Sequence, residues 1–490
     1  YAAEKIEIDI TGIQLTDSTL TAQINNISAT DKYNNDTPLQ LATSLSISAD
    51  TLRIPTFSAT YGECQTKLNN IEALLNNLPT LALQIDQSNI SCATLQPYIS
   101  KLPANANIAI SGSVSATTDK ITLRNISVDN DLNTHIDING SINNYQTPSN
   151  ANIDIAATNL RTTIDDIAQL MSTAIEPTIG QAFGLMSGQI TANGNTAETI
   201  KLNAFIASDA GIVDAKANIS ELNQYTANIH SDGINLSPFT NQLIGRTSLN
   251  FDIEGDTLYA HVKGQLPNFT LCNYTYHDVM IDGIVGAEYN TGLIHIDDPN
   301  GQITIVGEYG KHNDEKNLNL TARITDLFTG RTNLTPTLDG KLNLALRTHL
   351  SGKDIDNSNG ELIISTFSFA DSLRTATNNK LQLNIEPNTD NRKNITISSD
   401  HVNGYITGRL RYTDLANELY KQLYTHANAL LDKRPTNNIE PVEMNLNLAY
   451  SDIDQYLQFF SKDIKLANNG NIDTGFLCAK CIKHAFKTYP

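Results

Sequence analysis

The chain has 490 residues, of which 17% are charged, and its 33 Lys and Arg against 52 Asp and Glu give a net charge of −19. Nucleic acids and anionic bilayer surfaces bind clustered basic side chains, so this balance argues against both as partners. A hydrophobic share of 40% is too high for a disordered chain, and 27 glycines with 15 prolines are too few for a linker.

The dominant pattern is a strict alternation of apolar and polar residues, which is typical of a β-strand with one apolar face. It recurs along the chain, and Asn, Asp, Thr, Ser and Lys fill the intervening positions. In chain order, clear examples are Ile6 to Ile10, Ile108 to Val114, Ile136 to Ile142, Leu249 to Gly255, Val262 to Leu266, Ile303 to Tyr309, Leu318 to Ile324, Leu338 to Leu346, Leu381 to Ile385 and Val402 to Tyr412. Turn-forming stretches between them predict a long antiparallel meander.

Several glycines share the parity of the apolar residues within these strands. They are Gly112, Gly140, Gly255, Gly264, Gly307, Gly340, Gly404 and Gly408. Glycine inside a strand marks a bend or a close approach by a backbone or a ligand. Two interpretations stay open: the apolar face curves or leaves room for something, or the glycines relieve crowding where two sheets close.

Helical periodicity is brief, and it predicts short helices at residues 95–102, 161–175, 414–433 and 453–460 that plug or cap the sheet. A chain of this length allows on the order of 30 to 40 strands, and an open twisted sheet seldom exceeds about ten without curling. The sequence therefore predicts an all-β fold: a long curled antiparallel sheet, or open trough, over residues 1–475. Residues 476–490 lose the alternation and turn basic, so we expect this tail not to belong to the native fold.

Catalytic and cofactor motifs are absent, so the sequence predicts no enzyme, no cofactor and no metal. Asp297 and Asp298 precede Pro-Asn-Gly and indicate a turn. Residues 354–365 fail the EF-hand pattern at the glycine and glutamate positions. Cys478-x-x-Cys481-x-x-His484 lacks the partner ligands of a zinc site.

The five cysteines are Cys64, Cys92, Cys272, Cys478 and Cys481, and an odd number in a long chain does not indicate a disulfide framework. No run of about 18 apolar residues could cross a membrane. Because Tyr1 has neither an initiator Met nor a signal sequence, we expect an N-terminus that was processed or cut from a longer chain.

Strand and turn sequences in the second half carry a resemblance to a known family. They are residues 235–239 (NLSPF), 248–255 (SLNFDIEG), 294–301 (IHIDDPNG), 318–323 (LNLTAR), 350–357 (LSGKDIDN) with 360–362 (GEL), and 398–404 (SSDHVNG). Over about residues 230–415 the chain resembles the TamB family of translocation and assembly module subunits, within the wider AsmA-like group. These stretches are strand and turn idioms and not catalytic signatures.

The resemblance implies a periplasmic β-taco of a Gram-negative envelope that carries phospholipid between the inner and outer membranes. It also implies a role in outer-membrane biogenesis, barrel-protein assembly and secretion. An N-terminal inner-membrane helix and a C-terminal domain that meets an Omp85-type barrel are expected in the full-length protein and are missing from this chain. No nucleic acid is expected as a partner.

The apolar face is the expected path of phospholipid acyl chains. We expect its lining to include Ile108, Ile110, Ile136, Ile138, Phe251, Ile253, Ile303, Ile305, Leu342, Leu344, Ile406 and Leu410. Two alternatives stay open: a structural scaffold for outer-membrane protein assembly or secretion that carries no lipid, and a surface β-solenoid adhesin. The sequence does not identify the lipid, the direction of transport or its energy source.

Overall fold

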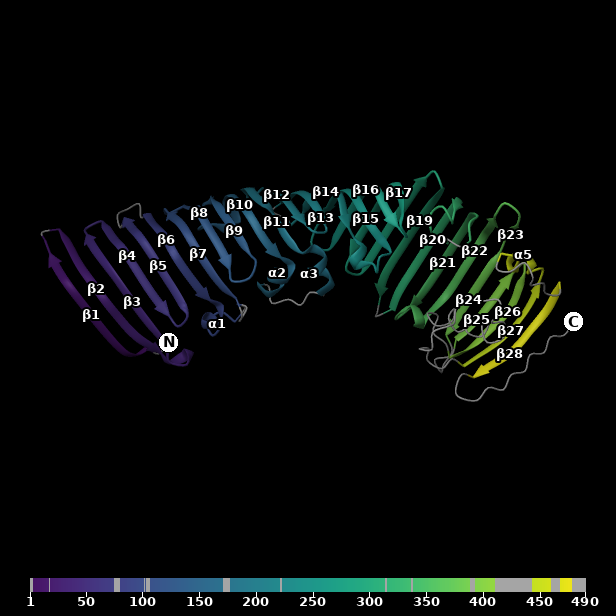
Figure 1. Cartoon of the computed structure of the whole chain (residues 1–490), viewed down its shortest axis with the longest axis horizontal. Helices are drawn as coiled ribbons and strands as arrows, with labels where there is room; N and C mark the ends of the chain where they lie inside the picture. The colour runs from purple at the N-terminus through teal and green to yellow at the C-terminus, as the bar shows by residue number, and fades with distance from the viewer. Residues whose placement is uncertain are drawn as a thin grey trace. The chain divides into compact units, whose positions relative to one another are not determined.

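The fold was described from a computed structural model. It covers residues 3–16, 18–74, 80–100, 102, 106–170, 177–220, 223–312, 315–335, 338–387, 393–409, 443–459 and 468–477. These residues contain 28 strands in an open antiparallel sheet, with a few short helices (Figure 1). The first strand, β1, pairs with β2 alone and the last, β28, with β27 alone among the described residues. The predicted all-β class and open antiparallel sheet are therefore confirmed.

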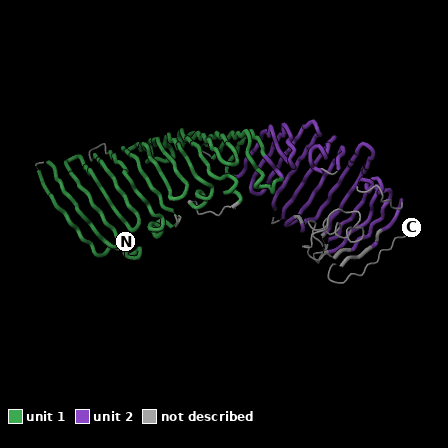
Figure 2. The backbone as a smooth tube through the Cα atoms, viewed as in Figure 1, with its two compact units in different colours: residues 1–242, 246–257 green, residues 243–245, 258–490 purple. Residues whose placement is uncertain are grey.

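The chain divides into two compact units (Figure 2). Unit 1 comprises residues 1–242 and 246–257, and unit 2 comprises residues 243–245 and 258–490. The strands of unit 1 are β1 (Ala3–Leu15), β2 (Thr19–Asp31), β3 (Thr37–Ser48), β4 (Thr51–Tyr61), β5 (Cys64–Leu74), β6 (Thr80–Ser91), β7 (Asn107–Ala116), β8 (Lys120–Asn130), β9 (His135–Asn143), β10 (Asn152–Thr163), β11 (Leu185–Asn195), β12 (Thr199–Ser208), β13 (Gly211–Ser220), β14 (Tyr225–Asn235) and β15 (Ile244–Gly255), whose first two residues fall to unit 2.

Unit 2 continues the same pattern of successive strands. They are β16 (Tyr259–Leu271), β17 (Tyr274–Gly286), β18 (Tyr289–Asp298), β19 (Gly301–His312), β20 (Glu315–Phe328), β21 (Lys341–Gly352), β22 (Ser358–Ala370), β23 (Thr375–Asn378), β24 (Leu381–Pro387), β25 (Lys393–Ser399), β26 (Val402–Arg409), β27 (Glu443–Ser451) and β28 (Asn469–Leu477). Because β28 extends to Leu477, the native strand pattern runs slightly past the boundary expected at residue 475. Residues 478–490 lie outside the described residues.

The short helices differ from their predicted positions. They are α1 (Cys92–Leu95), α2 (Ile164–Leu170), α3 (Pro177–Phe183) and α5 (Asp454–Leu457), with 3-10 turns η1 (Lys32–Asn34), η2 (Pro148–Asn150), η3 (Ser237–Phe239) and η4 (Ile355–Asn357). The helix predicted at 414–433 lies outside the described residues.

A helix cap and strand pairing account for two of these corrections. The helix expected at 95–102 is wrong, because α1 spans only Cys92–Leu95, where the side chain of Ser91 accepts a hydrogen bond from the Thr94 amide and caps the helix, and residues 96–98 form a turn. The helix expected at 161–175 begins at residue 164, because residues 161–163 still pair with β11. The helix expected at 453–460 spans only Asp454–Leu457 and lies against β23, where the amide of Thr377 donates to Gln455 Oε1 at 2.9 Å.

Bulges keep the apolar side chains on one face where the alternation shifts by one residue. In β8 the apolar positions change from odd to even numbers between Leu123 and Ile126, and Asn125 lies there in the left-handed region with φ 49°. The same shift occurs at Asn159 in β10 and at Asp326 in β20, both with φ 51°. An extra residue in a bulge reverses the parity, and Asn and Asp tolerate the left-handed conformation. The apolar positions therefore change between odd and even residue numbers, whereas their side chains stay on the same face of the sheet.

Burial is low throughout, because the strands of each unit pack extensively only on their neighbours in the ladder. The largest fully buried side chains are Tyr276, Leu327 and Val279. Within each unit, no described strand closes a second sheet over the first, so crowding between two sheets does not explain the glycines.

Candidate functional site: an apolar face built from cross-strand rows

The register of unit 1 aligns apolar residues into rows that cross its strands. Residues directly opposite each other in an antiparallel ladder place their side chains on the same face. The Ile138 row runs over β8–β15 as Ile126, Ile138, Ala157, Ile190, Ala204, Ala215, Ile229 and Phe251. The Ile253 row runs beside it as Leu123, Gly140, Ile155, Ala192, Leu202, Ala217, Ala227 and Ile253. The structure thus places the predicted residues Ile138, Phe251 and Ile253 on one face.

The other predicted residues of unit 1 belong to shorter alignments. Ile110 lies opposite Val128, and Val128 lies opposite Ile136. Since Ile136 and Ile138 are two residues apart on β9, this alignment shares their face. Ile108 lies opposite Ile90 of β6.

Unit 2 forms an apolar face in the same way. The Ile305 row runs over β17–β22 and β24 as Ile281, Ile294, Ile305, Ala322, Leu346, Ile364 and Leu381. The Leu344 row runs over β18–β22 as Ile296, Ile303, Ile324, Leu344 and Phe367.

Two further predicted residues of unit 2 lie outside these rows. Leu342 pairs with the buried Leu327 and Phe369, and Ile406 pairs with Ile395 and Leu446. Leu410 lies outside the described residues.

Much of this face is accessible to solvent. Ile190 in the Ile138 row and Ile294 in the Ile305 row each expose 38% of their surface, although both are large aliphatic side chains. Coverage is uneven, because Ile296, two residues from Ile294 on β18, exposes only 6%. Most other residues of the rows are half-buried, so the rows form a continuous and partly accessible apolar surface, which on soluble proteins marks a binding surface.

The opposite face is polar and is tied together across the strands. Asn203 Nδ2 donates to Thr191 Oγ1 at 3.2 Å, and Asn228 Nδ2 donates to Asp252 Oδ1 at 3.0 Å. Individual apolar residues such as Phe205 and Val306, 41% and 48% exposed, also lie on this face, opposite Gln189 and Thr321 respectively. They provide controls for any test of the apolar face.

Glycines on the apolar face fall into two classes. Gly140 and Gly404 have φ of 153° and 152°, and a Cβ on either would lie within 2.2 Å of a neighbouring backbone oxygen. They permit a backbone geometry that other residues resist. By contrast, a Cβ on Gly292 would meet nothing within 4 Å, and one on Gly307 would meet its nearest atom at 3.5 Å.

Gly283, Gly292 and Gly307 are directly opposite one another on β17, β18 and β19. This glycine row lies beside the exposed Ile294 of the Ile305 row. Neither backbone conformation nor lack of space requires glycine at positions 292 and 307. The glycine row is therefore a strip of the apolar face without side chains, where an apolar ligand can approach the backbone.

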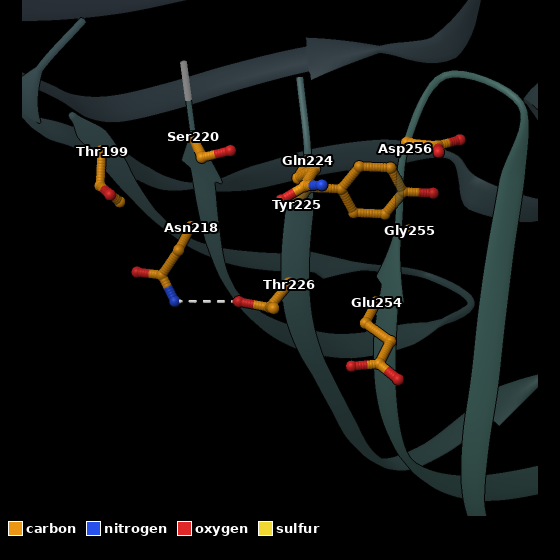
Figure 3. Close-up of a pocket in the computed structure, with 9 residues that line it drawn as sticks. All are labelled: Thr199, Asn218, Ser220, Gln224, Tyr225, Thr226, Glu254, Gly255 and Asp256. Carbon is orange, nitrogen blue, oxygen red and sulfur yellow. Dashed lines mark hydrogen bonds between the residues drawn. The ribbon is translucent and has the colours of Figure 1, made fainter. Parts of the chain in front are cut away.

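Two hollows lie on the polar side of the strands. One, of ≈ 450 Å³, is lined by residues of β12–β15 and of the turns beside them (Figure 3). Asn218 Nδ2 donates a hydrogen bond to Thr226 Oγ1 in its lining at 3.2 Å. The other, of ≈ 630 Å³, is lined by β25 and β26. The linings of the two hollows consist mainly of amide, hydroxyl and carboxylate side chains and include no His, Cys or Lys.

One ionisable side chain of the sheet stabilises a turn. Asp298 accepts hydrogen bonds from Tyr274 Oη at 2.6 Å and from the Asn300 amide at 2.8 Å, so the Asp297-Asp298 stretch enters a turn as expected. Burial, with smaller contributions from Asp400 and Asp452, raises the pKa of Tyr456 to about 12. Among the described residues, no three His, Cys, Asp or Glu side chains gather as a metal site requires.

Comparisons with known proteins do not assign the chain to a family. No protein-family model, no curated protein and no solved structure matches it. Within the described ranges, none of the helices has the length and hydropathy needed to cross a membrane.

Proposed function

We propose that the apolar face of each unit binds phospholipid acyl chains and that the chain is part of a TamB-like, AsmA-like bridge for lipid transport. The observation that carries the proposal is the cross-strand apolar rows, which are partly accessible to solvent, with Ile190 in unit 1 and Ile294 in unit 2 each 38% exposed. A face of this kind fits a ligand that is long, apolar and uniform along its length.

The chemistry of the face favours loose binding. Burial of each methylene contributes roughly 0.8 kcal/mol, and the described rows present no charged group that would select one headgroup. An acyl chain in contact with a few side chains at a time is thus held by a few kcal/mol and exchanges readily. This suits a conduit better than a storage site.

The resemblance supplies the wider setting of the proposal. The protein would act in the periplasm of a Gram-negative cell, supporting outer-membrane biogenesis and barrel-protein assembly. In this setting the protein would be anchored in the inner membrane and would meet an Omp85-type barrel.

Photocrosslinking at matched positions tests lipid contact directly. A photoreactive residue at Ile190 or Ile294 should capture phospholipid in cells, whereas one at Phe205 or Val306, similarly exposed on the polar face, should not. Mass spectrometry of the purified protein should also detect co-purified phospholipid. Equal capture on both faces, or none on either, would contradict the proposal and favour a scaffold that carries no lipid.

A charge on the face should interrupt transport without unfolding the chain. We expect Ile253→Asp combined with Leu344→Asp to block lipid passage, because each carboxylate lies in an apolar row that an acyl chain must follow. Lipid transfer between membranes is the measurement, and circular dichroism checks the fold. Unchanged transfer by the folded double variant would refute this path.

A further inference from the structure

Two cysteines of unit 1 lie at neighbouring strand ends. Cys64 is the first residue of β5, and Cys92 is the first residue of α1, directly after β6. β5 and β6 are antiparallel, with Gln65 opposite Asn89, so the start of β5 lies beside the end of β6.

A hydrogen bond sets the separation of the two residues. Cys64 Sγ donates to the backbone oxygen of Ser91 at 3.6 Å. Within a trans peptide unit that oxygen lies roughly 2.8 Å from the next Cα. The sulfur of Cys64 is therefore at most about 6.4 Å from the Cα of Cys92 by the same backbone dimensions.

The surroundings hold the two cysteines in place and make them unequal. Ser91 Oγ donates to Glu63 Oε2 at 3.1 Å, which ties the end of β6 to the β4–β5 turn. Cys92 is 0% exposed and Cys64 is partly exposed. Burial raises the pKa of the Cys92 thiol, with smaller contributions from Cys64 and Asp131.

We propose that Cys64 and Cys92 form a disulfide that ties the β4–β5 turn to α1. Both are free thiols in this structure. The proposal is independent of lipid binding. The odd number of cysteines hides the pair, because Cys272 belongs to unit 2 and Cys478 and Cys481 lie outside the described residues.

The oxidant is a small-molecule or protein disulfide, such as glutathione disulfide. The partly exposed Cys64 thiolate attacks one sulfur of the oxidant, whose other sulfur leaves as a thiolate. The Cys92 thiolate then attacks the Cys64 sulfur and releases the second thiol. The two cysteine protons pass to the two departing thiolates, so one disulfide is reduced for the one that forms.

Peptide mapping of the intact chain tests the bond. After equilibration with excess glutathione disulfide and alkylation of remaining thiols, we expect a Cys64–Cys92 cross-linked peptide. The oxidised chain should unfold several degrees above the reduced chain, since the bond closes a long loop in the unfolded state.

Variants separate this bond from other pairings. Cys64→Ser and Cys92→Ser should each abolish the cross-linked peptide and the oxidation-dependent shift in unfolding, and Cys272→Ser should retain both. Recovery of Cys64 and Cys92 as alkylated thiols, of a lasting glutathione adduct on Cys64, or of Cys64 joined to another cysteine would each overturn the proposal.

Discussion

Replacing Gly292 by Val should stabilise the protein while weakening its binding of lipid. A Cβ at this position meets nothing within 4 Å, and the residue lies within β18 outside the left-handed region. Glycine in a strand interior costs roughly 0.5–1 kcal/mol relative to alanine, and β-branched residues favour strands further. We therefore expect Gly292→Val to raise the free energy of unfolding by about 0.5–1 kcal/mol.

Gly360 provides the matched control within unit 2. It lies opposite Leu350 in β21, has φ 135°, and a Cβ on it would lie 2.0 Å from the backbone oxygen of His349. Because that oxygen belongs to the neighbouring strand and cannot rotate away, Gly360→Val should destabilise by at least about 2 kcal/mol. The two substitutions thus have opposite expected signs.

Thermal unfolding and lipid capture measure the two effects separately. For a unit of this size, 1 kcal/mol shifts the midpoint by about 2–4 °C. Gly292→Val should unfold slightly later than the parent and yield less co-purified phospholipid, because its side chain fills the glycine row. If Gly292→Val lost as much stability as Gly360→Val, the space beside Gly292 would not be open to a side chain. Unchanged lipid capture by Gly292→Val would refute a role of the glycine row in lipid binding.

Three further predictions concern burial, protonation and salt. Ile296→Ala should destabilise the protein more than Ile294→Ala in chemical denaturation, because the two side chains are 6% and 38% exposed. This difference corresponds to roughly 60 Å² of buried surface, or about 1.5 kcal/mol. Equal losses of stability would contradict the difference in burial between the two residues. The hydrogen bond between His135 and Asp129, at 2.6 Å, raises the pKa of His135. The stability that this pair contributes to the folded protein is therefore complete below the unfolded-state pKa of His135 and is lost as pH rises through its folded-state pKa. An NMR titration should therefore show a lower His135 pKa in Asp129→Asn, and an unchanged pKa would remove this assignment. Phospholipid capture should change little when the salt concentration is raised, since acyl chains and not headgroups contact the face, and loss in high salt would indicate electrostatic binding instead.

The sequence predicted the strands and their faces well, because alternation with period 2 depends only on local geometry and on which side avoids water. It missed the bulges at Asn125, Asn159 and Asp326, although the signal was present as a change of parity beside an Asn or Asp. The sequence did not show that Gly292 has free space for a side chain and Gly140 has none, because only the strand register shows whether a neighbouring backbone occupies the Cβ position. Nor could spacing along the chain bring Cys64 beside Cys92, which depends on the pairing of β5 with β6.

The pairing of strands with their neighbours in sequence has a consequence for how such a chain changes length. Within each unit the described strands pair with their neighbours in sequence, except that β24 pairs with β22 and β25, and β23 is recorded as pairing with β22 alone. Removing or inserting two consecutive strands restores the chain direction and leaves every other pairing intact. The sheet of such a protein can therefore gain or lose one hairpin at a time, and the apolar side chains of the remaining strands stay on the same face.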